Sequence, residues 1–153
     1  MAQIVNVDIG VTPAATGSGL LLMDEAHCRL IFMTSDRKVA VLHVSGCTQS
    51  IYGYPNDEAQ AGHPMYNDWA YGVYEVIGSG WAERLERQNR INFPDVRWTV
   101  KKRHFIVTFH ELMGEFLASD VHVEVSAEVF DKTGASVLLS ILSDNAKPSI
   151  IPI

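Results

Sequence analysis

The sequence predicts one β-rich α+β domain over residues 1–153. We expect an antiparallel sheet of roughly seven or eight strands, strongly curved or closed into a barrel-like meander, with one short helix packed on it. Three observations predict this fold. Short polar turns separate apolar runs in the first half, long alternating runs follow in the second half, and one segment has helical spacing. With 153 residues, 47% of them hydrophobic, the chain can bury a core of its own.

The first half is expected to form strands joined by short turns. An alternating run at 3–8 predicts a strand, and the Gly- and Thr-containing stretch at 10–19 predicts a loop. Three apolar runs follow, separated by brief polar segments, and connections this short join only antiparallel neighbours. The runs at 20–23, 27–34 and 39–44 are therefore expected to form a meander.

The clearest helix is predicted at 81–89. Trp81 and Leu85 lie four residues apart, and most other positions in the segment are charged or polar. A helix this short is not stable alone, so its apolar side chains must dock on the sheet. The aromatic and β-branched run at 69–77 predicts a strand before it, and Gly78, Ser79 and Gly80 are interpreted as a turn.

Two long alternating runs dominate the second half. In the run 98–110, Phe105 and its alternate neighbours share one face, and His104 and its alternate neighbours share the other. A turn after this strand leads into a second predicted strand at 115–130, which is expected to pair with the first. The apolar segment 136–142 fits a last strand or a short helix equally well.

Composition limits the classes of function. Acidic residues outnumber basic ones 18 to 12, and the net charge of -6 disfavours nucleic acid as a partner. The basic run 97–103 is interpreted as a solvated edge strand. We expect a cytoplasmic protein with no membrane partner, since no leader pattern and no bilayer-spanning apolar stretch is visible. Cys28 and Cys47 are expected to be reduced thiols, with a bridge between them as the less favoured alternative.

The segment 45–68 differs from the rest because it has no hydrophobic periodicity. Connections of this length are uncommon in compact domains and are often functional. Asn56 is placed to cap a single helical turn, with two acidic residues at the positive end of that turn. We expect any function to lie on the loop 52–66, facing the strand that contains His104 and His110.

Several short strings in this part of the chain occur in a distinctive order. They are GYPNDEA at 53–59, GHPMY at 62–66, YEV at 74–76, SGW at 79–81 and TFH at 108–110. In this order they resemble a family of small uncharacterised bacterial proteins with a GYPNDEAxxGHPxY motif. The resemblance covers residues 44–118 and implies no activity, substrate or cofactor.

Candidate ligand-binding residues come from the loop and from the strand that it is expected to face. They are Tyr54, Asp57, Glu58, His63, Tyr66, His104 and His110. Carboxylates and an imidazole can hold a divalent metal or transfer protons. The spacing matches no standard metal motif, and no phosphate-binding loop occurs, so neither a metal nor any other cofactor is predicted. The alternative interpretation is that the acidic pair caps a helical turn and His63 bonds a backbone carbonyl.

A second group of histidines is predicted around the turn between the two long strands. His104 is expected opposite His122, or opposite Glu124 if the turn is longer. Either arrangement offers a two-ligand metal half-site or a proton-sensitive pair, and the alternative is an ordinary polar sheet face. Glu111 and Glu115 flank the turn and are expected to be solvent-exposed.

Catalytic patterns are scarce. No Gly-x-Ser-x-Gly elbow occurs. The density of aromatic residues around the irregular loop leads us to favour a non-catalytic ligand- or protein-binding module. Its partner would be a second copy of the chain, another protein or a small molecule. The alternative function is a small metal-assisted or hydrolytic enzyme that uses the 52–66 loop and the 104–110 strand.

Overall fold

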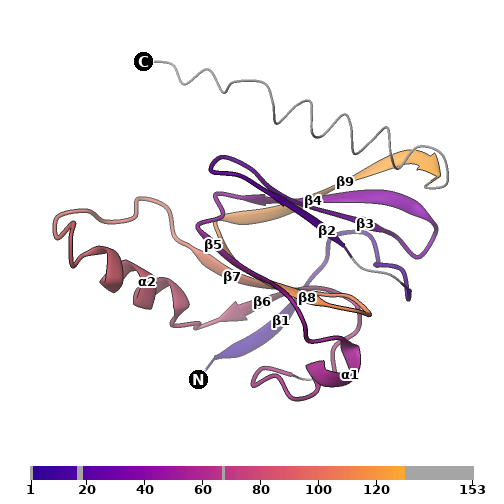
Figure 1. Cartoon of the computed structure of the whole chain (residues 1–153), viewed down its shortest axis with the longest axis horizontal. Coiled ribbons are helices and arrows are strands. Elements are labelled where there is room, and N and C mark those ends of the chain that lie inside the picture. The colour runs from indigo at the N-terminus through magenta and orange to yellow at the C-terminus, as the bar shows by residue number, and fades with distance from the viewer. Residues whose placement is uncertain (1, 17–18, 67, 130–153) are drawn as a thin grey trace.

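The computed structural model describes residues 2–16, 19–66 and 68–129, which form nine strands and two helices (Figure 1). All strand pairs are antiparallel, and they make two sheets. The five-stranded sheet has the order β1 (Gln3–Val7), β6 (Gly72–Ile77), β7 (Arg103–Thr108), β8 (Met113–Ala118) and β5 (Gln49–Gly53). The four-stranded sheet has the order β2 (Leu20–Met23), β3 (Cys28–Met33), β4 (Lys38–Ser45) and β9 (Asp120–Val129).

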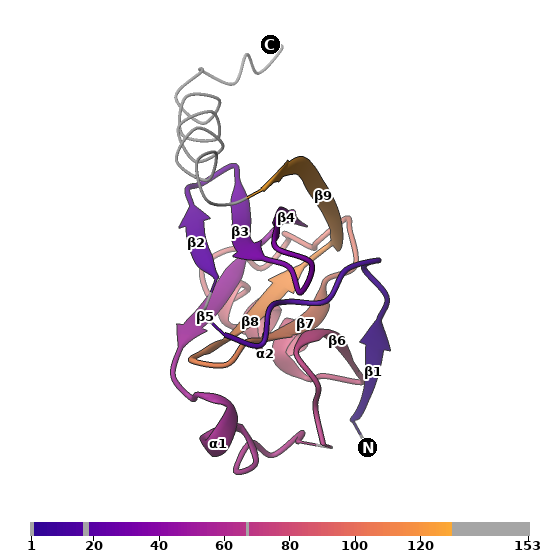
Figure 2. The same cartoon turned by 90° about the vertical axis from the view of Figure 1, so that its right-hand side faces the viewer.

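The two sheets pack face to face, and the main hydrophobic core lies between them (Figures 1 and 2). Leu30 and Leu42 enter this core from the four-stranded sheet, and Phe105 and Phe116 enter it from the five-stranded sheet. All four side chains are completely buried. The alternation predicted for the strand at 98–110 is confirmed over β7, because Phe105 faces the core and its neighbour His104 faces away from it.

The predicted β-rich antiparallel fold is confirmed, but its division into two sheets was not predicted. Within the described residues each sheet is an open row of strands, so the expected barrel-like closure is not found. The segment 115–130 was expected to be one strand paired with the strand before it, and this is wrong. It covers most of β8, which pairs with β7, and all of β9, which pairs with β4 in the other sheet.

The chain passes from one sheet to the other at Ser119, and the alternation of core-facing residues shifts at the same point. Phe116 and Ala118 face the core from β8, whereas Val121 and Val123 face it from β9. The core-facing positions therefore shift from even to odd numbers, which an uninterrupted strand cannot do. The Ser119 amide donates to the Ser45 carbonyl of β4, so it already belongs to the second sheet.

Several local predictions are confirmed. Strands β2, β3 and β4 form the expected meander, and helix α2 (Trp81–Asn89) has the predicted bounds. Helix α1 (Asp57–Gln60) is the single turn expected in the irregular loop, and the Asn56 side chain accepts a hydrogen bond from the Ala59 amide as its cap. The loop also contains β5, which has no alternating signal and was not predicted. The segment 136–142 lies outside the described residues.

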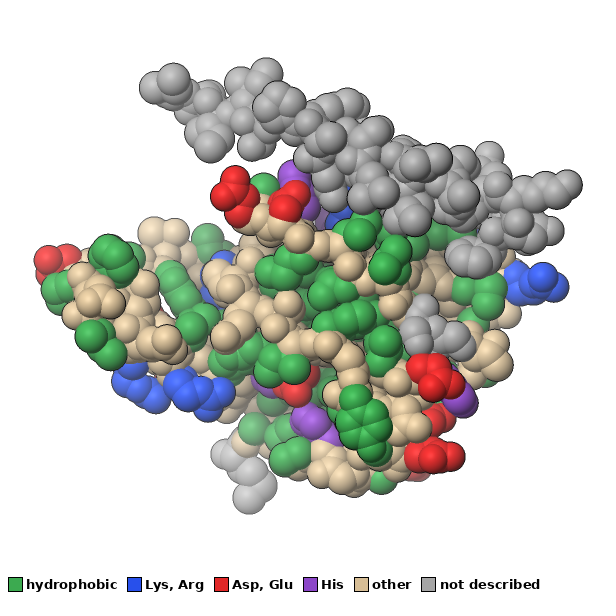
Figure 3. Space-filling view, in the orientation of Figure 1, with side chains coloured by type: hydrophobic (Ala, Val, Ile, Leu, Met, Phe, Trp, Pro, Cys, Tyr) green, Lys and Arg blue, Asp and Glu red, His purple; other side chains and the backbone are tan. Residues whose placement is uncertain are grey.

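Helices α1 and α2 flank the five-stranded sheet, on the face away from the main core. Tyr74, Val76, Ile106 and Met113 form a second buried cluster on this outer face. Figure 1 shows α1 on the far side of this sheet from the four-stranded sheet. Helix α2 docks through its buried Trp81 and turns charged side chains outward, and Figure 3 shows basic groups gathered along it. The two helices thus cover part of the outer face, and the site described below lies on this face.

Two further features concern the helices and the cysteines. No helix within the described ranges is long and apolar enough to cross a bilayer. Cys28 and Cys47 are both free thiols, as expected. A hydrogen bond between their sulfur atoms and burial raise the pKa of Cys28.

We expect the core between the sheets to dominate stability. Truncating the buried Phe116 to Ala should lower the free energy of unfolding by about 3–5 kcal/mol, through lost burial and a residual cavity. The matched change Phe93→Ala removes a ring that is 57% exposed, and should cost less than about 1 kcal/mol. Urea denaturation followed by tryptophan fluorescence measures both. Equal losses in the two variants would contradict this assignment of the core.

Candidate functional site

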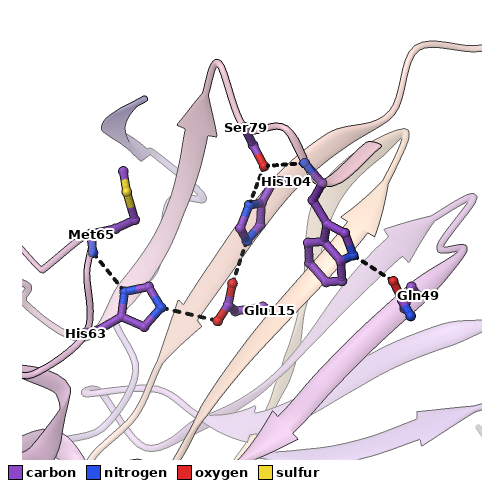
Figure 4. Close-up of polar contacts among 7 residues, drawn as sticks. Gln49, His63, Met65, Ser79, His104 and Glu115 are labelled. Atoms are coloured by element: carbon purple, nitrogen blue, oxygen red, sulfur yellow. Dashed lines mark hydrogen bonds and ion pairs between the residues drawn. The ribbon is translucent and has the colours of Figure 1, made fainter. Parts of the chain in front are cut away.

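The carboxylate of Glu115 is the centre of a hydrogen-bonded chain on the outer face of the five-stranded sheet (Figure 4). Its Oε2 lies 2.7 Å from His104 Nε2, and its Oε1 lies 3.2 Å from His63 Nε2. Strand register explains the first contact, because Glu115 lies opposite Ile106, and His104 is two residues before Ile106 on the same face of β7. The Glu115 side chain is only 20% exposed, so the expectation that it points into solvent is wrong.

His63 reaches Glu115 from the loop that follows α1. Its Nδ1 accepts a hydrogen bond from the Met65 amide at 3.1 Å (Figure 4). A backbone amide can only donate, so Nδ1 carries no proton and the ring proton is on Nε2, facing Glu115. The His63 ring also packs against Trp69, with 5.1 Å between ring centroids. The backbone and Trp69 therefore fix both the tautomer and the orientation of this imidazole.

His104 continues the chain toward Ser79. The short contact with an ionised carboxylate places the ring proton on Nε2, which leaves Nδ1 as an acceptor. With His104 in that neutral tautomer, Ser79 Oγ, which lies 2.9 Å from Nδ1, donates its proton there, and the same oxygen accepts from the Trp81 amide at 3.3 Å. In this series of hydrogen bonds, which runs from the Trp81 amide to Glu115, each donor thus meets an acceptor.

The connection between β6 and α2 positions Ser79. Gly78 turns the chain with a φ of 73°, a left-handed conformation that glycine adopts without strain. Three residues after Gly78, α2 begins at Trp81, and the Trp81 ring packs edge-on against His104 with centroids 4.8 Å apart. The Trp81 indole in turn donates to the Gln49 side chain of β5 at 2.6 Å (Figure 4). The serine is therefore held between a strand end and a docked helix.

Glu115 is held as an anion. The hydrogen bond from His104 lowers its pKa below the ordinary value, and the hydrogen bond from His63 acts in the same direction, whereas burial opposes both. Both carboxylate oxygens accept a hydrogen bond, as a partly buried carboxylate requires.

Ser79 and His104 line a polar hollow beside the start of α2. The hollow has a volume of about 150 Å³. Ala82 and Glu83 of the first turn of α2 form part of its wall, and Lys101 lies on another side. Glu115 is not among the lining residues, so it supports the wall from behind through His104.

Asp57 and His110 belong to a separate cluster. Tyr71 donates to Asp57 Oδ2 at 2.7 Å, and His110 Nε2 lies 3.8 Å from the same oxygen. The hydrogen bond from Tyr71 lowers the pKa of Asp57, and the same contact raises the pKa of Tyr71 to about 12. His110 also contacts Glu111 at 2.7 Å. This cluster ties α1 to the end of β7.

The candidates predicted from the sequence are only partly brought together. His63 and His104 meet through Glu115, and Asp57 approaches His110. The remaining candidates lie elsewhere: Tyr54 is 79% exposed, Glu58 is exposed, and Tyr66 packs on Trp69.

The predicted neighbours of His104 are wrong. His104 lies opposite Leu117, whereas His122 and Glu124 lie on β9, opposite His43 and Val41 in the other sheet. The change of sheets at Ser119 separates His104 from both of them.

Ser79 and Glu115 were missed by the sequence analysis. Glycines on both sides of Ser79 have the signature of a turn, which hides its role. The signal for Glu115 was available, because it precedes the buried Phe116 and so must occupy the opposite face of β8. That face is also the face of His104.

Comparisons of the chain with family models, with curated proteins and with solved structures found no match.

The lowered pKa of Glu115 predicts a specific dependence of stability on acidity. The unfolded chain binds this proton at a higher pH, near 4.5, than the folded chain does. The stabilising contribution is therefore present above that pH, and is lost as the pH falls through the folded-state pKa. Chemical denaturation at a series of pH values between about 5 and 3 should show a steeper loss of stability for the wild type than for Glu115→Gln. Parallel curves would contradict this prediction.

Proposed function

We propose that the protein is a small hydrolase in which Ser79 is the nucleophile, His104 the general base and Glu115 the carboxylate that orients the base. The observation that carries the proposal is the 2.9 Å contact between Ser79 Oγ and His104 Nδ1 on the wall of a hollow. A nucleophile in contact with a base, and a base oriented by a third group, is the arrangement that activates a serine hydroxyl.

The reaction proposed for an ester proceeds in two stages. Ser79 Oγ attacks the carbonyl carbon as its proton passes to His104 Nδ1, and the collapsing intermediate expels the alcohol, which takes that proton. Water then attacks the acyl-serine, losing its proton to Nδ1 and returning the serine hydroxyl with release of the acid. Throughout, the Nε2–H group of His104 keeps its proton and its hydrogen bond to Glu115. The negative charge of Glu115 stabilises the transient imidazolium. His63 is a positioning residue that holds the second oxygen of Glu115.

The two ring nitrogens of the histidine exchange roles relative to the familiar Ser-His-Asp arrangement. There Nε2 faces the serine and Nδ1–H faces the carboxylate. Here Nδ1 faces Ser79 and Nε2–H faces Glu115. Either neutral tautomer presents one lone pair and one N–H group, so the same proton transfers are available.

The first turn of α2 supplies the stabilisation of the developing oxyanion in this proposal. The first amides of a helix have no partner within it, and they carry the positive end of its dipole. The Trp81 amide is used by Ser79, whereas Ala82 and Glu83 line the same hollow. In this proposal the former carbonyl oxygen of a substrate bonded to Ser79 Oγ lies beside these amides and carries the negative charge. The small polar hollow favours a short, polar acyl group.

A fluorophosphonate probe tests the nucleophile directly. An activated serine forms an oxygen–phosphorus bond with the probe and releases fluoride, and peptide mass spectrometry locates the adduct. We expect labelling at Ser79 and none in Ser79→Ala. The control Ser35→Ala removes an exposed turn serine and should leave the labelling unchanged. Equal labelling of wild type and Ser79→Ala would overturn the assignment of the nucleophile.

Hydrolysis of p-nitrophenyl acetate tests the whole arrangement. Ser79→Ala should lower kcat/KM by about 10³-fold or more, and Glu115→Gln by about 10²-fold or more, because the amide cannot stabilise the imidazolium. Circular dichroism of each variant checks that the fold is intact. A wild-type protein that neither takes up the probe nor cleaves the ester would overturn the proposal, and would favour a non-catalytic binding module instead.

A further inference from the structure

A second site lies on the other sheet. The geometry points to His43, His122 and Glu124 as ligands of a divalent transition-metal ion, with Zn²⁺ as the ion best suited to them. Among the described residues, these three form the group whose ligand atoms all lie within 4.8 Å of one another. None of them belongs to the Ser79 site, so this proposal is independent of the proposed function.

The pairing of β4 with β9 brings the three side chains together. His43 lies directly opposite His122, and Glu124 follows two residues later on β9. His43 alternates with Leu42 and Val44, which face the main core, so it points to the outer face of the four-stranded sheet. Opposite residues and alternate residues of antiparallel strands share one face, and all three ligands therefore project to the same side.

The distances are close to those a metal needs. Zinc bonds of about 2.0–2.1 Å in tetrahedral geometry place the ligand atoms about 3.3–3.4 Å apart. His43 Nε2 and Glu124 Oε2 are already 3.3 Å apart. The His43 and His122 rings stack with centroids 4.6 Å apart and planes at 4°. The ligand atoms of all three residues lie within 4.8 Å of one another, so the remaining separations exceed those of a bound ion by about 1.4 Å at most.

One atom at this site lacks a partner. His43 Nε2 is buried, and no hydrogen bond reaches it from the described residues, because its approach to Glu124 does not have hydrogen-bond geometry. A buried polar atom without a partner costs free energy, and a bound cation shared with Glu124 and His122 would satisfy it. Two imidazoles and one carboxylate are a ligand set that zinc commonly takes, and they leave a fourth position for water.

The surroundings set the expected affinity. His43 and His122 line a shallow hollow of about 110 Å³, which gives an ion and its water access to the site. Arg29 pairs with His43 across β3 and β4 and lines the same hollow. Its positive charge repels a bound cation and so weakens binding. The exposed Glu124 carboxylate compensates part of this charge. We therefore expect micromolar binding rather than the tighter binding of a closed structural site.

Isothermal titration of the full chain, freed of any affinity tag, with Zn²⁺ tests the proposal. We expect one ion per chain and a rise in thermal stability on binding. His122→Ala and Glu124→Gln should each weaken binding by at least about tenfold, a loss of about 1.4 kcal/mol. Both side chains are exposed, so these variants should fold. Substitution with Co²⁺ should give the visible absorption of a tetrahedral ion in wild type and lose it in the variants.

Two control variants separate this site from the others. His27→Ala removes a histidine that lines the same hollow without belonging to the ligand set, and it should retain binding. Glu115→Gln impairs the proposed hydrolase site and should also retain it, so the two proposals fail independently. Absence of zinc binding to wild type, or binding that survives both His122→Ala and Glu124→Gln, would overturn the inference.

Discussion

The double hydrogen bond to Glu115 is the constraint on which the outer face of the five-stranded sheet depends. A carboxylate that is four-fifths buried loses most of its hydration and needs donors on both oxygens. His104 and His63 provide them from a neighbouring strand and from the loop after α1. Through His104 the same interaction extends to Ser79 and the start of α2. The loop after α1, the start of α2 and the paired strands β7 and β8 are thus connected through one carboxylate.

The alternation of a β-strand allows one strand to serve both the core and the site. On β7, Phe105 fills the space between the sheets while His104, the residue before it, carries the polar chain. The packing of the phenylalanine fixes the strand, and the strand fixes the direction of the imidazole. Side chains on paired strands of a packed sheet are held more rigidly than side chains on a loop, which suits the role proposed for His104 as a base in contact with Ser79.

Local patterns were sufficient to predict the meander, the cap at Asn56 and the bounds of α2, because short turns and helical spacing act within a few residues. The partners of the strands could not be predicted, because they depend on contacts between distant segments. His104 was assigned to the wrong neighbours for this reason, although its face was correct. His63 and His104 were recognised from their chemistry. Ser79 was missed because the glycines around it indicate a turn, and Glu115 was missed because it was expected to be solvent-exposed. The odd spacing between Ala118 and Val121 contained the information that the sheet changes there.

That odd spacing also makes the join between β8 and β9 intolerant of length changes. Loss of one residue at Ser119 would restore an unbroken alternation through both strands, and β9 would then have to turn over or slip along β4. If it turned over, the valines that face the core would point into water, and His122 and Glu124 would point into the hydrophobic interior. Point substitutions at this position leave the number of residues unchanged, so the side chains of β9 keep their present faces. Sequence variation here is therefore expected to be restricted in length.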